Sequence, residues 1–166
     1  AVRLIGAPAS DPGRGFAEHV RWVNSLNCPD KLAAERFIDS PVVNPTSMVR
    51  ASVLDSLGGY SDPEWAEDYD LWLRIALKHE FYFIEEPLIT KRGGHADQLS
   101  RKYWGMDRFR VSALKKLLEE NSLDKEKLQL TRAALVKKCS VLIKGFAKRG
   151  QKKDEFFYRE LINQYG

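Results

Sequence analysis

Apolar side chains recur at every third or fourth position through most of the last sixty residues, the spacing of amphipathic helices. It predicts a helix from about residue 106 to 121, a second that is capped by Ser122 and ends at residues 149–150, and a third over residues 152–165. Their apolar positions are, in chain order, Met106, Phe109, Ala113, Leu114, Leu117 and Leu118; Leu128, Leu135, Cys139, Leu142 and Phe146; and Phe156, Phe157, Leu161, Ile162 and Tyr165.

The pattern before residue 105 is mixed, with short apolar runs between turn signals. Pro41 and Pro45 cannot donate to a β-ladder, so the strand in that stretch is expected to begin near Thr46. Gly58 and Gly59 suit the end of a helix. We expect strands at residues 1–6, from about 46, at 81–84 and at 88–90, and helices at residues 16–26, 30–37 and 51–57.

A further helix is predicted from near Glu67, or from Asp62 and Pro63, to about residue 79. It would bury Leu71, Trp72, Ile75 and Ala76. Three carboxylates fall in its first turn, where the backbone N–H groups and the helix dipole stabilise negative charge.

These three carboxylates allow two readings. Asp70 is best explained as a structural partner of Arg74, four residues on. Glu67 and Asp68 lie among aromatic residues, and a carboxylate on a partly enclosed aromatic rim can act as a base. An ordinary acidic helix start is the alternative for both residues.

Composition and charge restrict the class of protein without naming a function. The chain has 27 Lys and Arg against 23 Asp and Glu, a mild excess that suits an anionic ligand or membrane surface. No apolar run approaches the length of a membrane span. Cys28 and Cys139 match no metal or redox spacing, which favours a reducing compartment and a buried thiol at Cys139.

A basic segment with paired glycines, residues 91–95, follows the predicted strand at 88–90. Glycines let a backbone approach a ligand closely, and Lys, Arg and His side chains can face a phosphate or a metal. A basic surface turn with an idle His95 is the alternative.

One stretch of the chain resembles the second half of the inverting family 2 glycosyltransferases. It consists of Gly58-Gly59-Tyr60, a short acidic loop and residues 67–74. Residues 41–50 and 95–100 resemble the flanking motifs of that family in the same order. The resemblance covers residues 1–104 and implies an α/β fold class, a partial GT-A domain with mixed short strands. The helices from residue 105 to 166 would then form an α-helical extension.

The resemblance implies transfer of a sugar from a nucleotide-diphospho-sugar to a hydroxyl of a glycan or lipid-linked acceptor, with inversion. Asp68 would be the general base and Glu67 its support, while Trp65 and Asn44 would bind the acceptor. Arg92, His95 and Arg101 would face the diphosphate, and His95 would also reach a divalent metal, Mg or Mn.

The family also implies a setting and a limit. A role in surface-polysaccharide and cell-envelope synthesis is expected, in the cytoplasm at the inner face of the membrane, with peripheral membrane association and no nucleic acid. The metal-binding Asp-x-Asp of the family's first half is missing here. Because the first residues already read as a strand, we expect a truncated chain that is inactive alone.

One alternative is a non-catalytic binding module whose helical tail recruits a protein partner, with the acidic motif as a structural remnant. A weaker alternative is a basic helical domain for nucleic acid. It is disfavoured because the Lys residues spread around the helices instead of forming a stripe with aromatics.

Overall fold

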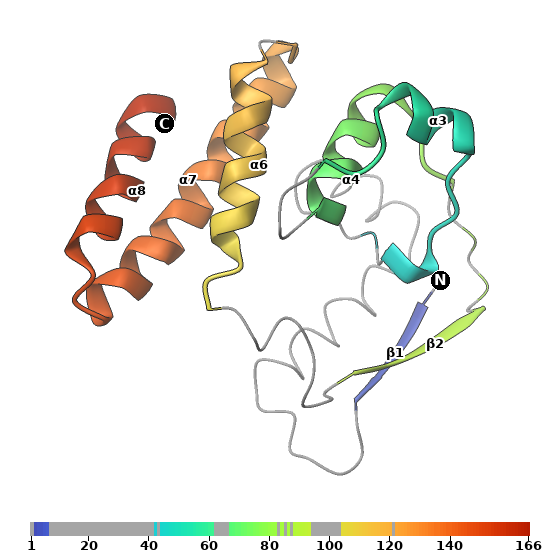
Figure 1. The fold of residues 1–166 in the computed structure, drawn as a ribbon, viewed down its shortest axis with the longest axis horizontal. Helices are drawn as coiled ribbons and strands as arrows, with labels where there is room; N and C mark the ends of the chain where they lie inside the picture. Colours follow the sequence, from blue (N-terminus) through green and yellow to red (C-terminus); the bar gives the residue numbers. More distant parts are fainter. Residues whose placement is uncertain are drawn as a thin grey trace. The chain divides into compact units, whose positions relative to one another are not determined.

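The computed structural model describes residues 2–6, 42, 44–61, 67–82, 84, 86, 88–93, 104–120 and 122–166 (Figure 1). The helices predicted at residues 16–26 and 30–37 lie outside these residues. The chain divides into two compact units. Unit 1 consists of Ala1–Gly59 and Leu71–Tyr103, and unit 2 of Tyr60–Asp70 and Trp104–Gly166. A domain boundary between residues 104 and 105 stays a prediction.

The predicted α/β fold class, a partial GT-A domain with mixed strands, is wrong for the part of the chain that the structure describes, which is helical. Its strands are two five-residue segments, β1 (Val2–Gly6) and β2 (Ile89–Gly93). Among the described residues they pair in parallel with each other, from Val2 opposite Ile89 to Gly6 opposite Gly93, and no third strand joins them.

The strands expected near Thr46 and at residues 81–84 are also absent from the described residues. A single 3-10 turn, η1 (Asn44–Thr46), stands where the first was expected, and residues 81, 82 and 84 have no regular structure. Val42, Val49 and Phe81 instead pack their side chains on a helix. Apolar side chains in a short run can be buried in this way without strand pairing, so the run did not identify a strand.

Unit 1 is organised on helix α4 (Glu67–Lys78), whose residues from Leu71 onward belong to this unit. The buried core residues Leu71, Trp72 and Ile75 confirm the predicted buried face, whereas Ala76 is only half-buried. Helix α3 (Ala51–Ser56) supplies further packing residues, including Val53, Leu54 and Leu57. The ring centroids of Trp72 and Phe81 lie 5.9 Å apart.

The end of α3 confirms the role predicted for its two glycines. Gly58 and Gly59 have φ of 72° and 70°, in the left-handed region. The Gly59 N–H donates to Leu54 O at 2.8 Å and the Gly58 N–H to Asp55 O at 3.2 Å. This pair of bonds is a Schellman motif, which satisfies the last carbonyls of the helix.

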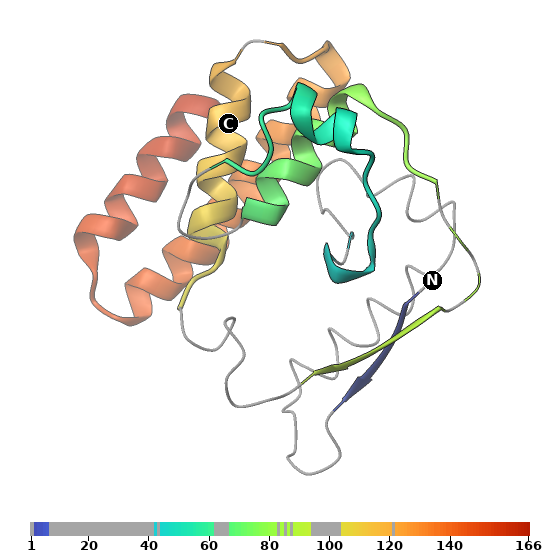
Figure 2. The same ribbon diagram turned by 45° about the vertical axis from the view of Figure 1, so that its right-hand side comes forward.

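Unit 2 contains three long helices, α6 (Asp107–Glu119), α7 (Lys125–Lys148) and α8 (Lys152–Tyr165), which confirm the predicted series (Figure 2). Helix α7 packs against both α6 and α8. The cap of α7 differs from the prediction: Asp124, not Ser122, accepts the Lys127 N–H at 2.8 Å. The large apolar side chains of the core are Val111, Leu114, Leu117, Leu118, Leu135, Leu142, Ile143, Phe146, Tyr158 and Leu161.

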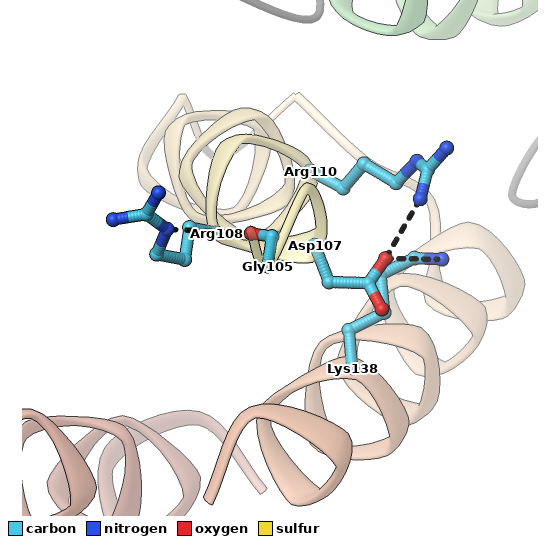
Figure 3. Close-up of polar contacts among 5 residues, drawn as sticks. All are labelled: Gly105, Asp107, Arg108, Arg110 and Lys138. Carbon is cyan, nitrogen blue, oxygen red and sulfur yellow. Dashed lines mark hydrogen bonds and ion pairs between the residues drawn. The ribbon is translucent and has the colours of Figure 1, made fainter. Parts of the chain in front are cut away.

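An ionic contact joins the start of α6 to the middle of α7 (Figure 3). Asp107 Oδ1 lies 2.9 Å from Arg110 Nη1 and 3.9 Å from Lys138 Nζ. In the preceding turn, Arg108 Nε donates to Gly105 O at 3.3 Å. Asp107 therefore places an anionic group in the first turn of α6, where the helix dipole favours it, and also contacts α7.

Only some of the positions of α8 that were predicted to face the core are buried. Leu161 is buried, but Phe156 and Phe157 are 65% and 53% exposed, and Tyr158 is the buried aromatic residue. The Tyr158 ring stacks on Phe146 of α7 at a centroid distance of 5.5 Å. Three consecutive aromatic residues cannot share one helix face, because successive residues are about 100° apart.

No helix among the described residues is long and apolar enough to cross a membrane.

Candidate functional site

The first turn of α4 carries the acidic motif and belongs to unit 2. Within this turn Asp70 is buried, with 6% of its surface exposed. Its Oδ2 accepts the Ser61 hydroxyl at 2.5 Å, and its Oδ1 lies 3.6 Å from Lys116 Nζ on α6. A buried carboxylate needs such partners to offset its loss of hydration. The structural reading of Asp70 is therefore supported.

Arg74, the partner predicted for Asp70, bonds to the turn that ends α3. Its Nη1 donates to Leu57 O at 2.7 Å and its Nη2 to Gly59 O at 2.9 Å. The guanidinium thereby reaches two carbonyls of the Schellman turn, 17 and 15 residues away in sequence. An Asp70–Arg74 pair stays a prediction.

Asp68, the candidate base, has a different environment from Asp70 although it lies only two residues earlier. It is half-buried, and its Oδ1 accepts the Tyr69 backbone N–H at 2.7 Å. This bond satisfies one donor of the helix start and holds the carboxylate near the N-terminal end of α4.

Tyr69 also holds this turn in place through its own contacts. It is buried, and Lys138 Nζ of α7 lies 5.8 Å from the centre of its ring, within the range of a cation–π contact. Tyr69 and Asp70 thus anchor the turn from which the Asp68 side chain extends.

The structure describes some of the remaining predicted site residues and not others. Asn44 lies in η1, where its carbonyl accepts the Ser47 N–H at 3.2 Å and the Ser47 hydroxyl at 2.7 Å. Glu67 is the first residue of α4 and Arg92 lies in β2. Three predicted residues lie outside the described part of the chain: Trp65, His95 and Arg101.

The divalent metal stays a prediction, because its predicted ligand His95 lies outside the described residues. No three His, Cys, Asp or Glu side chains come together among them in a way that could hold an ion. The sequence Asp68-Tyr69-Asp70 has the spelling of a metal motif, but Asp70 is already bound by Ser61 and Lys116. The ammonium group of Lys116 supplies positive charge beside that carboxylate.

Ser61, Lys116 and Lys138 were not predicted as neighbours of the acidic motif. Ser61 lies nine residues before Asp70, and the two lysines lie on helices α6 and α7. Their spacing in sequence carries no local signal, and each looks like an ordinary surface position.

No family model, curated protein or solved structure matches the chain.

Proposed function

We propose that this chain provides the acceptor side of a sugar-transfer reaction, with Asp68 as the general base. The donor class is a nucleotide-diphospho-sugar, and the acceptor is a hydroxyl of a glycan or lipid-linked glycan. The proposal starts from the sequence resemblance around Gly58-Gly59-Tyr60 and residues 67–74 and does not depend on a GT-A fold.

The observation that supports it is the difference in burial and bonding between Asp68 and Asp70. Asp70 is buried and bonded to Ser61 and Lys116, so its carboxylate serves the folded turn. Asp68 is half-buried, and its described bond leaves lone pairs on both carboxylate oxygens. A carboxylate that is held in place but reachable is what a general base requires.

The proposed chemistry is a single displacement. The acceptor hydroxyl oxygen forms a bond to the anomeric carbon of the sugar while the hydroxyl proton passes to an Asp68 carboxylate oxygen. The bond from the anomeric carbon to the diphosphate oxygen breaks, and its electron pair leaves with the nucleoside diphosphate. Attack from the face opposite the leaving group inverts the anomeric centre.

In the resembled family a divalent metal neutralises charge on the leaving diphosphate. No step above is routed through this metal, whose predicted ligand His95 lies outside the described residues.

The experiment is a transfer assay on the full-length protein with a panel of nucleotide-diphospho-sugars and glycan acceptors. We expect Asp68→Asn to lower turnover about 100-fold to 10,000-fold while the protein remains folded and binds the donor as before. Glu67→Gln should reduce transfer less, because Glu67 is assigned only a supporting role. Unchanged turnover in Asp68→Asn would overturn the assignment of Asp68 as the base. Absence of transfer by the wild-type protein with every donor and acceptor would favour the non-catalytic binding module instead.

A further inference from the structure

Helix α7 and the turn after it form a long cationic segment. Between residues 127 and 153 the chain contains no Asp or Glu and nine basic residues, which are Lys127, Arg132, Lys137, Lys138, Lys144, Lys148, Arg149, Lys152 and Lys153. The whole chain has a formal charge of only +4. The basic residues are therefore concentrated in this segment and balanced by acids elsewhere.

Four of these cations meet at the turn between α7 and α8, which lies at one end of the helical unit (Figure 1). We call Lys148, Arg149, Lys152 and Lys153, together with Phe156 and Phe157, the basic tip. All six residues are exposed. Gly150, with φ of 68°, makes the turn between the helices tight.

The two Phe residues lie beside the lysines on α8. Residues three or four apart are neighbours on a helix, so Phe156 adjoins both Lys152 and Lys153, and Phe157 adjoins Lys153. Phe156 is 65% exposed and Phe157 53% exposed, although the Phe157 ring also packs against the edge of Tyr158 at a centroid distance of 5.1 Å. The tip thus presents apolar rings directly beside positive charge.

The cations of the tip are available for a ligand. Within the described part of the chain, Lys148, Lys152 and Lys153 form no ion pair with an acid. Arg149 lies over the Trp104 ring at 3.9 Å and donates to Gly145 O at 3.0 Å, which holds its charge at the same end of the unit. Trp104 itself is 38% exposed there.

Two acids adjoin the tip. Asp154 is exposed in the first turn of α8, and Glu155 is bonded to Arg159 at 2.7 Å, so its charge is offset. The positive charge of the tip is therefore reduced by one nearby carboxylate, not cancelled.

We propose that the basic tip docks on the surface of a membrane that contains anionic lipid. Such a surface offers phosphate groups to the lysines, and acyl chains a few ångströms deeper for the two Phe rings. Single-stranded nucleic acids are bound by such residues in grooves that follow the backbone. The basic tip is instead an exposed turn between two helices, which suits a bilayer surface. The docking is independent of the proposed sugar transfer.

The test is co-sedimentation of the whole chain with sucrose-loaded vesicles of phosphatidylcholine alone or mixed equally with phosphatidylglycerol. Binding is expected only to the anionic vesicles and should weaken as salt is raised. Lys152→Gln with Lys153→Gln should lower the partition coefficient about 25-fold, since each lysine contributes about fivefold at such a surface. Phe156→Ser with Phe157→Ser should lower it at least about tenfold.

Matched controls lie at the other end of α7, roughly 30 Å away along the helix. Lys125→Gln with Arg132→Gln removes the same charge, and Leu130→Ser removes an exposed apolar side chain. Both controls should bind as the wild type does, and circular dichroism should show all variants folded. Equal binding to neutral vesicles, binding that survives both tip variants, or capture of single-stranded RNA without vesicle binding would overturn the proposal.

Discussion

The ammonium group of Lys116 lies 3.6 Å from the carboxylate of Asp70, although the two residues are far apart in sequence. The Lys116 side chain is half exposed, whereas that of Asp70 is 9% exposed. Water screens the lysine, so the pair itself contributes little, but the buried carboxylate depends strongly on its partners. The start of α4 is thus held by a residue of the predicted helical extension.

Ser61 and Lys116 both contact the Asp70 carboxylate, and removing each should have unequal effects on stability. Ser61→Ala leaves the buried Asp70 carboxylate without its hydroxyl donor and should lower the free energy of unfolding by about 1–3 kcal/mol. Lys116→Ala should lower it by no more than about 1 kcal/mol, because the ammonium is half exposed. Urea titrations of both variants measure the difference. A larger loss for Lys116→Ala would show that the ion pair, not the hydroxyl bond, supports Asp70.

The adjacent aromatic residues of α8 offer a test of how the helix faces the core. Tyr158 is buried on Phe146, so Tyr158→Ala should lower the free energy of unfolding by about 2–4 kcal/mol. Phe156→Ala removes a ring of similar size from an exposed position and should change it by less than about 0.5 kcal/mol. Thermal unfolding compares the two variants, and similar losses would contradict the orientation of α8.

Burial of Cys139 predicts a loss of stability at alkaline pH. Burial raises the pKa of this thiol from 9.0 to about 11. As pH rises above 9, the thiol ionises in the unfolded chain while the folded chain keeps its proton, so the unfolded state is favoured. The loss should reach roughly 2–3 kcal/mol by pH 11. Cys139→Ala should flatten this part of the stability profile, and an unchanged slope in that variant would contradict the assignment.

The cap of α7 predicts an effect at the acid end of the pH range. The Lys127 backbone N–H, helped by the Lys127 side chain, lowers the pKa of Asp124 below 3.8. The stabilisation is complete above the unfolded pKa and is lost as pH falls through the folded value. Asp124→Asn should therefore reduce the dependence of helicity on pH below about pH 4, measured by circular dichroism. A wild-type dependence in the variant would show that Asp124 does not titrate with the helix.

The long helices could be predicted because their apolar period continues over many turns. The bounds of α8 agree with the predicted residues 152–165, and Leu135, Cys139, Leu142 and Phe146 are buried as expected. Short apolar runs in the first half carried no such period. Val42, Val49 and Phe81 are partly buried on α4 without forming strands, which is why the α/β prediction failed.

Only those features of the candidate site that depend on neighbouring residues in the sequence could be predicted. The acidic turn followed from local spacing, and the start of α4 at Glu67 agrees with one of the two predicted starts. Asp70 was predicted to be structural through Arg74, whereas its observed partners are Ser61 and Lys116. Ser61, Lys116 and Lys138 reach this turn through tertiary packing. Which face of α8 is buried was likewise decided by contact with α7, which local periodicity does not reveal.

The most direct test of the central claim is the turnover number of Asp68→Asn in the full-length protein. Asp55→Asn is the matched control, because Asp55 is an exposed aspartate of α3 with no assigned role. We predict a fall of about 100-fold to 10,000-fold for Asp68→Asn, the usual contribution of a general base, and wild-type turnover for Asp55→Asn. Wild-type turnover in Asp68→Asn would contradict the assignment of Asp68 as the base.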